Sequence, residues 1–205
     1  MVKNGRKLIL VRGDLLERVS EITAKEGKTL FAFTNEVFER AIEAYRSHIS
    51  LAESLEFYRV MKTGKSLGYV VIPSDIFEHT IKKLYAVDRG FLLEKWYESG
   101  LWNGSYLSIK FHDQDPLEVV ERFMKASLWN MDEFVMNQCR GKIEVKCFSP
   151  SLSLEFVEML AKFLQGMFTS FGYSVKSNKC LRGIVIIELE NAKETQTPRT
   201  IEVVG

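Results

Sequence analysis

Apolar residues recur at helical spacing in two stretches near the start of the chain. The first stretch predicts a helix over residues 14–26, with Asp14 as its N-cap and Gly27 in the left-handed position that ends a helix. The second predicts a helix over residues 30–47, capped by Thr29. Each helix has one broad apolar face, so each needs another surface to bury that face against.

A short apolar strand, predicted over residues 6–12, precedes the two helices and places four aliphatic residues between basic ones. A strand and two helices of this size cannot bury both apolar helix faces by themselves. We therefore expect a second copy of the chain to cover them, which would make the protein a homodimer.

The rest of the pattern predicts a larger domain that mixes helices and strands. Asp115 and Pro116 begin a helix, and Cys139-Arg140-Gly141 is the turn of a hairpin. Residues 100–111 fit either a helix or a strand. The other predicted elements are helices over 51–62, 74–86, 91–99 and 152–171, and strands over 69–72, 131–138, 142–148, 173–176 and 184–189.

These elements predict an α+β protein, in which an N-terminal strand-helix-helix dimerisation unit is followed by an α+β domain with an antiparallel sheet. The predicted divisions are the dimerisation unit at 1–50, a linker helix and loop at 51–66, the α+β domain at 67–190 and a polar tail at 191–205. The loop is expected at 62–68, where glycine and charge interrupt the apolar pattern.

The composition is ordinary for a globular protein, with 205 residues, 46% hydrophobic and 27% charged. No apolar run is as long as a membrane span, and no basic, apolar leader opens the chain. Three cysteines without a paired spacing favour a reducing compartment. We therefore expect a cytoplasmic protein with no membrane partner.

The net charge of +1 does not by itself indicate a nucleic-acid partner, but its distribution is uneven. Lys3, Arg6, Lys7 and Arg12 lie in residues 1–12, which contain no acidic residue. A basic arm of this kind binds phosphate in a salt-dependent way. An ordinary solvated terminus has the same composition.

Residues 7–46 resemble the ribbon-helix-helix family through the strand, the run Leu15-Leu16-Glu17-Arg18-Val19, the turn Lys25-Glu26-Gly27-Lys28-Thr29 and the stripe ending Glu39-Arg40-Ala41-Ile42. The resemblance implies a dimer that lays a two-stranded ribbon in the major groove of DNA. The DNA contacts it implies are Lys3, Arg6, Lys7, Leu8, Leu10, Arg12 and Lys28.

The chain departs from that family at two outward strand positions, Leu8 and Leu10, where polar or basic residues are usual. Leucines there could read thymine methyl groups, bind little DNA, or be buried. The second helix also begins about one turn earlier than is usual in the family.

Residues 67–190 resemble the 4-vinyl-reductase-like sensor domains, which bind small molecules and are often attached to DNA-binding domains. The matching residues are Val71-Ile72-Pro73, Gly100 and Gly104, Glu144-Val145-Lys146-Cys147-Phe148-Ser149, Gly166 and Lys179-Cys180-Leu181-Arg182-Gly183. The resemblance implies a small-molecule ligand. Members often hold a metal through further cysteines, but only Cys180 lies in such a position here, so we expect no metal site.

Aromatic residues concentrate around Gly100 and Gly104, and these glycines would leave room for a small apolar or aromatic ligand. A large aromatic core explains the same residues. The candidate ligand-binding residues are Trp96, Trp102, Tyr106, Phe111 and Phe163, with Phe156, Phe168 and Phe171 as a possible opposite wall.

The sequence contains no complete catalytic or metal-binding motif. Gly64-Lys65-Ser66 lacks the earlier glycine of a phosphate-binding loop, because Arg59 stands in its place. The three cysteines lack the spacing of a zinc site. His112 beside Asp113 could act in acid–base catalysis, but a solvated loop before the next helix has the same sequence. We therefore expect no enzyme activity.

The leading hypothesis is a homodimeric transcription regulator with a DNA-binding N-terminal unit and a small-molecule-sensing C-terminal domain. The rival hypothesis is a ligand-binding or assembly protein whose N-terminal unit serves only dimerisation. A third is a small reductase-like or isomerase-like enzyme that uses the aromatic pocket. The sequence does not name the ligand or a cofactor.

Overall fold

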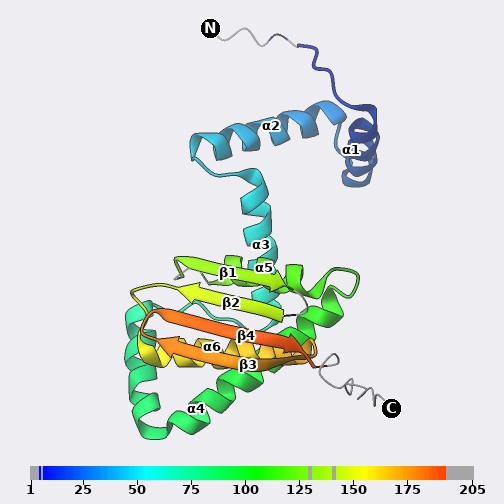
Figure 1. Ribbon diagram of the computed structural model, residues 1–205. Helices are drawn as coiled ribbons and strands as arrows, with labels where there is room; N and C mark the ends of the chain where they lie inside the picture. Colours follow the sequence, from blue (N-terminus) through cyan, green and yellow to red (C-terminus); the bar gives the residue numbers. More distant parts are fainter. Residues whose placement is uncertain (1–4, 6, 129–130, 140–141, 193–205) are drawn as a thin grey trace, which may run out of the picture. The chain divides into compact units, whose positions relative to one another are not determined.

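The computed structural model describes residue 5 and residues 7–128, 131–139 and 142–192. These residues form six helices and four strands (Figure 1), which confirms the predicted α+β fold. The chain divides into two compact units, Met1–Glu56 and Phe57–Gly205. The division lies inside helix α3 (Leu51–Ser66), which begins in the first unit and ends in the second.

The first unit contains two helices, α1 (Gly13–Glu26) and α2 (Leu30–Arg46). The turn between them is the predicted one, because Gly27 has φ 64° and Thr29 Oγ1 accepts a 3.1 Å hydrogen bond from the N–H of Ala32. The predicted N-cap of the first helix is wrong. Asp14 lies within the first turn of α1 and forms a 2.6 Å ion pair with Arg12.

Residues 7–12 form neither a helix nor a strand in the single chain. A strand needs a neighbour to satisfy its backbone hydrogen bonds, and none of the strands in the described part of the chain pairs with this segment. The strand predicted over 6–12 is therefore absent from the isolated chain, and Arg6 itself lies outside the described residues.

Helix α3 continues through the region predicted to be a loop. Gly64, Lys65 and Ser66 are helical, so they do not form a phosphate-binding loop, and Gly68 (φ 82°) then turns the chain. The strand predicted over 69–72 is wrong, because this apolar segment lies outside the sheet and joins α3 directly to the next helix. Its side chains border cavities instead of a neighbouring strand.

Helix α4 (Ser74–Lys110) unites two predicted helices with the ambiguous segment 100–111. It bends at Asp88, whose backbone is not helical (φ −150°, ψ 83°). Asp88 Oδ1 accepts a 2.9 Å hydrogen bond from the N–H of Phe91 and so caps the second half of the helix. The break predicted between the helices 74–86 and 91–99 is thus a kink within a long helix.

Two shorter helices complete the second unit. Helix α5 (Pro116–Ser127) begins as predicted, with Asp115 Oδ1 accepting hydrogen bonds from the N–H groups of Leu117 (2.8 Å) and Glu118 (3.1 Å). Helix α6 (Leu154–Ser170) is the most deeply buried element, in keeping with its apolar sequence. None of the helices in the described residues is long and apolar enough to cross a membrane.

The four strands form one antiparallel sheet in the order β1-β2-β4-β3. β1 (Glu133–Cys139) and β2 (Lys142–Phe148) are the predicted hairpin, and β3 (Tyr173–Leu181) and β4 (Ile184–Asn191) are the second predicted pair, extended by several residues. Side chains alternate between buried and accessible along β2 and β4. Helix α6 packs against β3 and β4, and α4 packs against α6 (Figure 1).

Candidate functional site

A cavity of about 610 Å³ lies within the second unit, between α4, α5, α6 and the connecting segment 69–72. This volume is typical of a small-molecule site. Most of the lining is apolar and comes from Val70, Val71 and Ile72 of the connecting segment, Phe77 and Trp96 of α4, Met124 of α5, and Phe156, Leu160 and Phe163 of α6.

Four aromatic rings on α4 and α6 form one wall of this cavity. The Trp96 ring lies edge to face with the rings of Phe77 (6.4 Å between centroids), Phe156 (6.4 Å) and Phe163 (6.1 Å). These contacts stabilise one another and hold the rings in place without a ligand. The aromatic wall is therefore preformed.

Apart from the indole N–H of Trp96, the polar groups on the described side chains that line the cavity are hydroxyls. Ser74, Ser99 and Ser127 are three of them, and no Lys, Arg, His, Asp or Glu occurs among its described lining residues. The fourth is Tyr69, whose hydroxyl donates a 2.8 Å hydrogen bond to Oδ1 of the buried Asn103. Burial raises the pKa of Tyr69, so this hydroxyl stays protonated at neutral pH.

The structure brings two of the five predicted ligand-binding residues, Trp96 and Phe163, to the cavity. Trp102 is 64% exposed, and Tyr106 lies with its ring 5.4 Å from Lys110 Nζ. Phe111 borders a separate hollow of about 160 Å³. Trp102, Tyr106 and Phe111 therefore do not line this cavity, because they project from other sides of α4 or from its end.

The hydrophobic pattern of the sequence did not identify Tyr69, Val70, Val71 and Ile72 as lining residues, because it predicted a strand there. An apolar run that ends at a proline can be either a strand or an apolar connection between helices, and the sequence alone does not separate the two. Phe156, suggested as part of an opposite wall, does line the cavity. Phe168 is instead fully buried in the core, and Phe171 borders the smaller hollow.

Gly100 and Gly104 of α4 and Gly166 of α6 serve helix packing and not the cavity. A Cβ on Gly100 would lie 2.0 Å from the backbone oxygen of Phe163, and a Cβ on Gly166 would lie 2.1 Å from that of Tyr97. None of Gly100, Gly104 and Gly166 lines the cavity. The expectation that Gly100 and Gly104 leave room for a ligand is therefore wrong.

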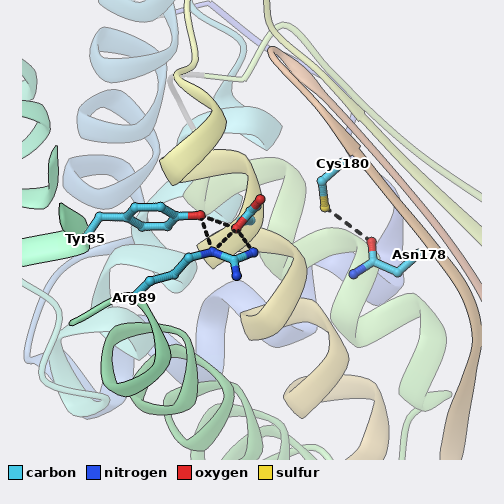
Figure 2. A network of polar contacts seen from close by, with 5 residues as sticks. Tyr85, Arg89, Asn178 and Cys180 are labelled. Carbon is cyan, nitrogen blue, oxygen red and sulfur yellow. Dashed lines mark hydrogen bonds and ion pairs between the residues drawn. The ribbon is translucent and has the colours of Figure 1, made fainter. Parts of the chain in front are cut away.

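A polar cluster joins α4 to α6 beside the kink (Figure 2). Tyr85 and Arg89 both bind the Glu158 carboxylate, with Arg89 Nη2 at 2.6 Å from Oε2. Arg89 Nε also donates to the Tyr85 hydroxyl at 2.6 Å. Burial and the bond to Glu158 raise the pKa of Tyr85. Each of these polar groups has a partner, so the cluster connects residues on both sides of the bend in α4 to α6.

The described residues contain no cluster of three or more His, Cys, Asp or Glu side chains that could hold a metal ion. Cys147 is buried, and Cys180 is half-buried with its Sγ 3.3 Å from Asn178 Oδ1 (Figure 2). The side chain of Cys139 lies outside what the structure describes. His112 is exposed, and Asp115 serves as the cap of α5.

The first unit has little core of its own. Thr23 is the one buried residue among the described residues of α1 and α2, and apolar side chains along both helices are exposed. Exposure alternates along the preceding segment: Leu8 is 91% and Leu10 92% exposed, whereas Ile9 is 60% and Val11 52% exposed. Leu8 and Leu10 are therefore the more exposed pair of these four residues in the single chain.

The predicted DNA-binding cations differ in their surroundings. Lys7 is exposed, and Lys3 and Arg6 lie outside the described residues. Arg12 is paired with Asp14, and Lys28 Nζ lies 3.0 Å from Glu36 Oε2 and 3.3 Å from Glu26 Oε2. These carboxylates raise the pKa of both cations and partly neutralise the local positive potential.

No protein-family model matches the chain, and no curated protein sequence matches it significantly. Two solved structures are similar to 63% of this chain, each with 13% identity and a TM-score of 0.37. One, from work on haem redox potential modulated by protein-induced porphyrin distortion, is covered over 86% of its length. The other, from work on haem distortion in the H-NOX family, is covered over 81%. A likeness at this level does not transfer the haem of those proteins to this chain.

Proposed function

We propose that the protein is a homodimeric DNA-binding transcription regulator whose second unit binds a small apolar molecule. The observation that carries the proposal is the exposure of the apolar faces of α1 and α2, with Thr23 as the one buried residue described in these helices. Exposed apolar area of this extent is costly in water. A second copy of the same two helices would bury it.

The segment 7–12 supplies the second argument for a dimer. Its backbone is outside any helix or strand, and its aliphatic side chains are exposed. Pairing with the same segment of a second chain would satisfy the backbone groups and form a two-stranded ribbon. Leu8 and Leu10 would then lie on the outer face of the ribbon, flanked by the basic residues Arg6 and Lys7.

The ligand-binding half of the proposal rests on the 610 Å³ cavity and its preformed aromatic wall. A cavity of this size with few polar groups favours binding over catalysis. A ligand can change DNA affinity only by binding two arrangements of the dimer with different affinities.

The test is binding of the purified protein to random duplex DNA across a salt series, with light scattering on the same samples. A dimer whose DNA affinity falls steeply as salt rises supports the regulator, because phosphate contacts release counterions. The double variant Arg6→Ala, Lys7→Ala should reduce both the affinity and the salt slope. An unchanged slope in that variant would show that the DNA-binding surface is elsewhere.

A second candidate function is a homodimeric ligand-binding or assembly protein that does not bind DNA. The observation that favours it is the pairing of Arg12 and Lys28 with carboxylates, together with the apolar outer residues Leu8 and Leu10. This candidate predicts a dimer that persists on dilution and binds no DNA even at low salt. The salt series therefore decides between the two functions.

A further inference from the structure

The connecting segment 69–72 separates two hollows of the second unit. On one side is the 610 Å³ cavity, and on the other is a hollow of about 120 Å³ lined by Val60, Met61 and Gly64 of α3. Tyr69, Val70 and Val71 line both. Whatever fills the larger cavity therefore touches the same three residues that face α3.

The segment is held firmly at its first residue. The Tyr69 N–H donates a 2.9 Å hydrogen bond to the Gly64 carbonyl, and its hydroxyl donates to Asn103. The Tyr69 ring also lies edge to face with Phe123, 6.0 Å between centroids. At the other end, the Pro73 carbonyl accepts a 3.0 Å hydrogen bond from the N–H of Phe77 in the first turn of α4.

The middle of the segment has no such attachment. Val70 is 83% and Val71 73% exposed. Among the backbone hydrogen bonds between described residues, none uses the N–H of Val70, Val71 or Ile72. Apolar side chains that are exposed beside an apolar cavity gain most when a molecule in that cavity covers them.

The lining also limits the chemistry of that molecule. Among its described lining residues the cavity has hydroxyl groups and the Trp96 indole N–H but no charged side chain, so a charged ligand would lose hydration there without gaining an ion pair. A neutral molecule with one or two hydrogen-bonding groups could meet the serine hydroxyls. We infer that the cavity takes an uncharged, largely apolar molecule, which covers Val70 and Val71 and fixes the segment 69–72 against α3.

This inference rests on the proposed ligand-binding function. It adds a route by which a bound ligand affects the structure outside the cavity. Helix α3 is continuous from Leu51 in the first unit to Ser66, and Tyr69 follows three residues later. The carboxyl-terminal part of α3 is itself attached to α4 through Lys110 Nζ and Thr63 Oγ1, 2.9 Å apart. If segment 69–72 is immobilised, it should therefore stabilise the carboxyl-terminal end of α3, the helix whose amino-terminal end belongs to the first unit.

The experiment compares two dyes of nearly the same shape, neutral N-phenylnaphthylamine and its sulfonated relative anilinonaphthalene sulfonate, by fluorescence titration of the full chain. The neutral dye should bind at least about tenfold more tightly, since a sulfonate would be desolvated without a partner. Equal affinity for the two dyes would overturn the uncharged class of ligand. Absence of binding by the neutral dye would overturn the ligand-binding function itself.

Hydrogen exchange with and without the neutral dye then tests the role of the segment. Amides of 70–72 and of 60–66 should exchange more slowly in the complex. Val71→Ser should weaken dye binding several-fold and remove the protection in α3, while Val87→Ser, a matched change at an exposed position outside the cavity, should change neither. Tight dye binding with unaltered exchange in 60–72 would overturn the inference and leave the ligand-binding function intact.

Discussion

At the scale of single residues, three glycines set the distance between α4 and α6. For Gly166, an added Cβ would lie 2.1 Å from the Tyr97 carbonyl oxygen and 2.9 Å from the Leu101 nitrogen. Both are backbone atoms, so no side chain can move aside to relieve the contact. The close packing of α4 against α6 thus depends on the absence of a Cβ atom at each of these three positions.

Gly166→Ala should lower the free energy of unfolding by about 3 kcal/mol or more, at the upper end of the cost of overpacking a core. Urea denaturation monitored by circular dichroism measures the change. Gly90→Ala is the matched control in α4, because its Cβ would meet only Asp88 Oδ1, at 3.6 Å; it should change stability by less than about 1 kcal/mol. Equal effects of the two substitutions would contradict the close approach.

Burial of the Cys147 side chain raises the pKa of its thiol from 9.0 to about 12. Between these two pH values the unfolded chain loses a proton that the folded chain keeps, so stability should fall as pH rises above about 9. The contribution of one such group is about 1.4 kcal/mol per pH unit. Cys147→Ala should make the decline in stability from pH 9 to pH 11 shallower by about that slope, as measured by urea denaturation. An unchanged slope would contradict the raised pKa.

At the scale of elements, α2 has a strong apolar stripe but no buried residue. We expect Val37→Glu, which places a charge in that stripe, to prevent the proposed dimer from forming, because a buried unpaired carboxylate costs far more free energy than the interface gains at that position. Light scattering after size-exclusion chromatography measures the mass. Asn35→Glu adds the same charge on the polar side of α2 and should leave the dimer intact. A dimeric Val37→Glu variant would show that α2 is not the interface.

The outward positions of Leu8 and Leu10 suggest contacts with thymine methyl groups in the major groove. If so, replacing thymine by uracil in the duplex, which removes only that methyl, should weaken binding by about 0.8 kcal/mol, or fourfold, for each methyl contacted. The double variant Leu8→Ala, Leu10→Ala should bind both duplexes equally. DNA binding by the native protein that is unaffected by uracil would show that the ribbon does not read thymine methyls.

At the scale of the whole molecule, a ligand-responsive regulator must couple its two binding events. If the neutral dye changes the affinity for DNA by some factor, then DNA must change the affinity for the dye by the same factor, because linkage is reciprocal. Dye titrations with and without duplex, and DNA titrations with and without dye, measure the two factors. Tight binding of both ligands with no mutual effect would show that the protein is not a ligand-controlled regulator.

Signals confined to a few residues predicted local structure well. Gly27 ends α1 and Thr29 begins α2, and Asp115 with Pro116 begins α5. The alternation of apolar and polar residues located both strand pairs. The prediction of Asp14 as the N-cap was wrong because the Asp14 carboxylate forms an ion pair with Arg12. The capping pattern takes no account of a side chain that competes with the backbone N–H groups for this carboxylate.

The sequence by itself determined that the chain has an α+β fold and where most of its helices begin, because caps and periodicity act within a few residues. It did not determine that α3 continues to Ser66 or that α4 runs on to Lys110. Only the tertiary structure decided that residues 69–72 join two helices outside the sheet, and that Trp96 and Phe163 line a cavity while Trp102 does not. The reason is that the hydrophobic effect is not directional. It requires that an apolar side chain be covered, and the packing of distant elements decides what covers it.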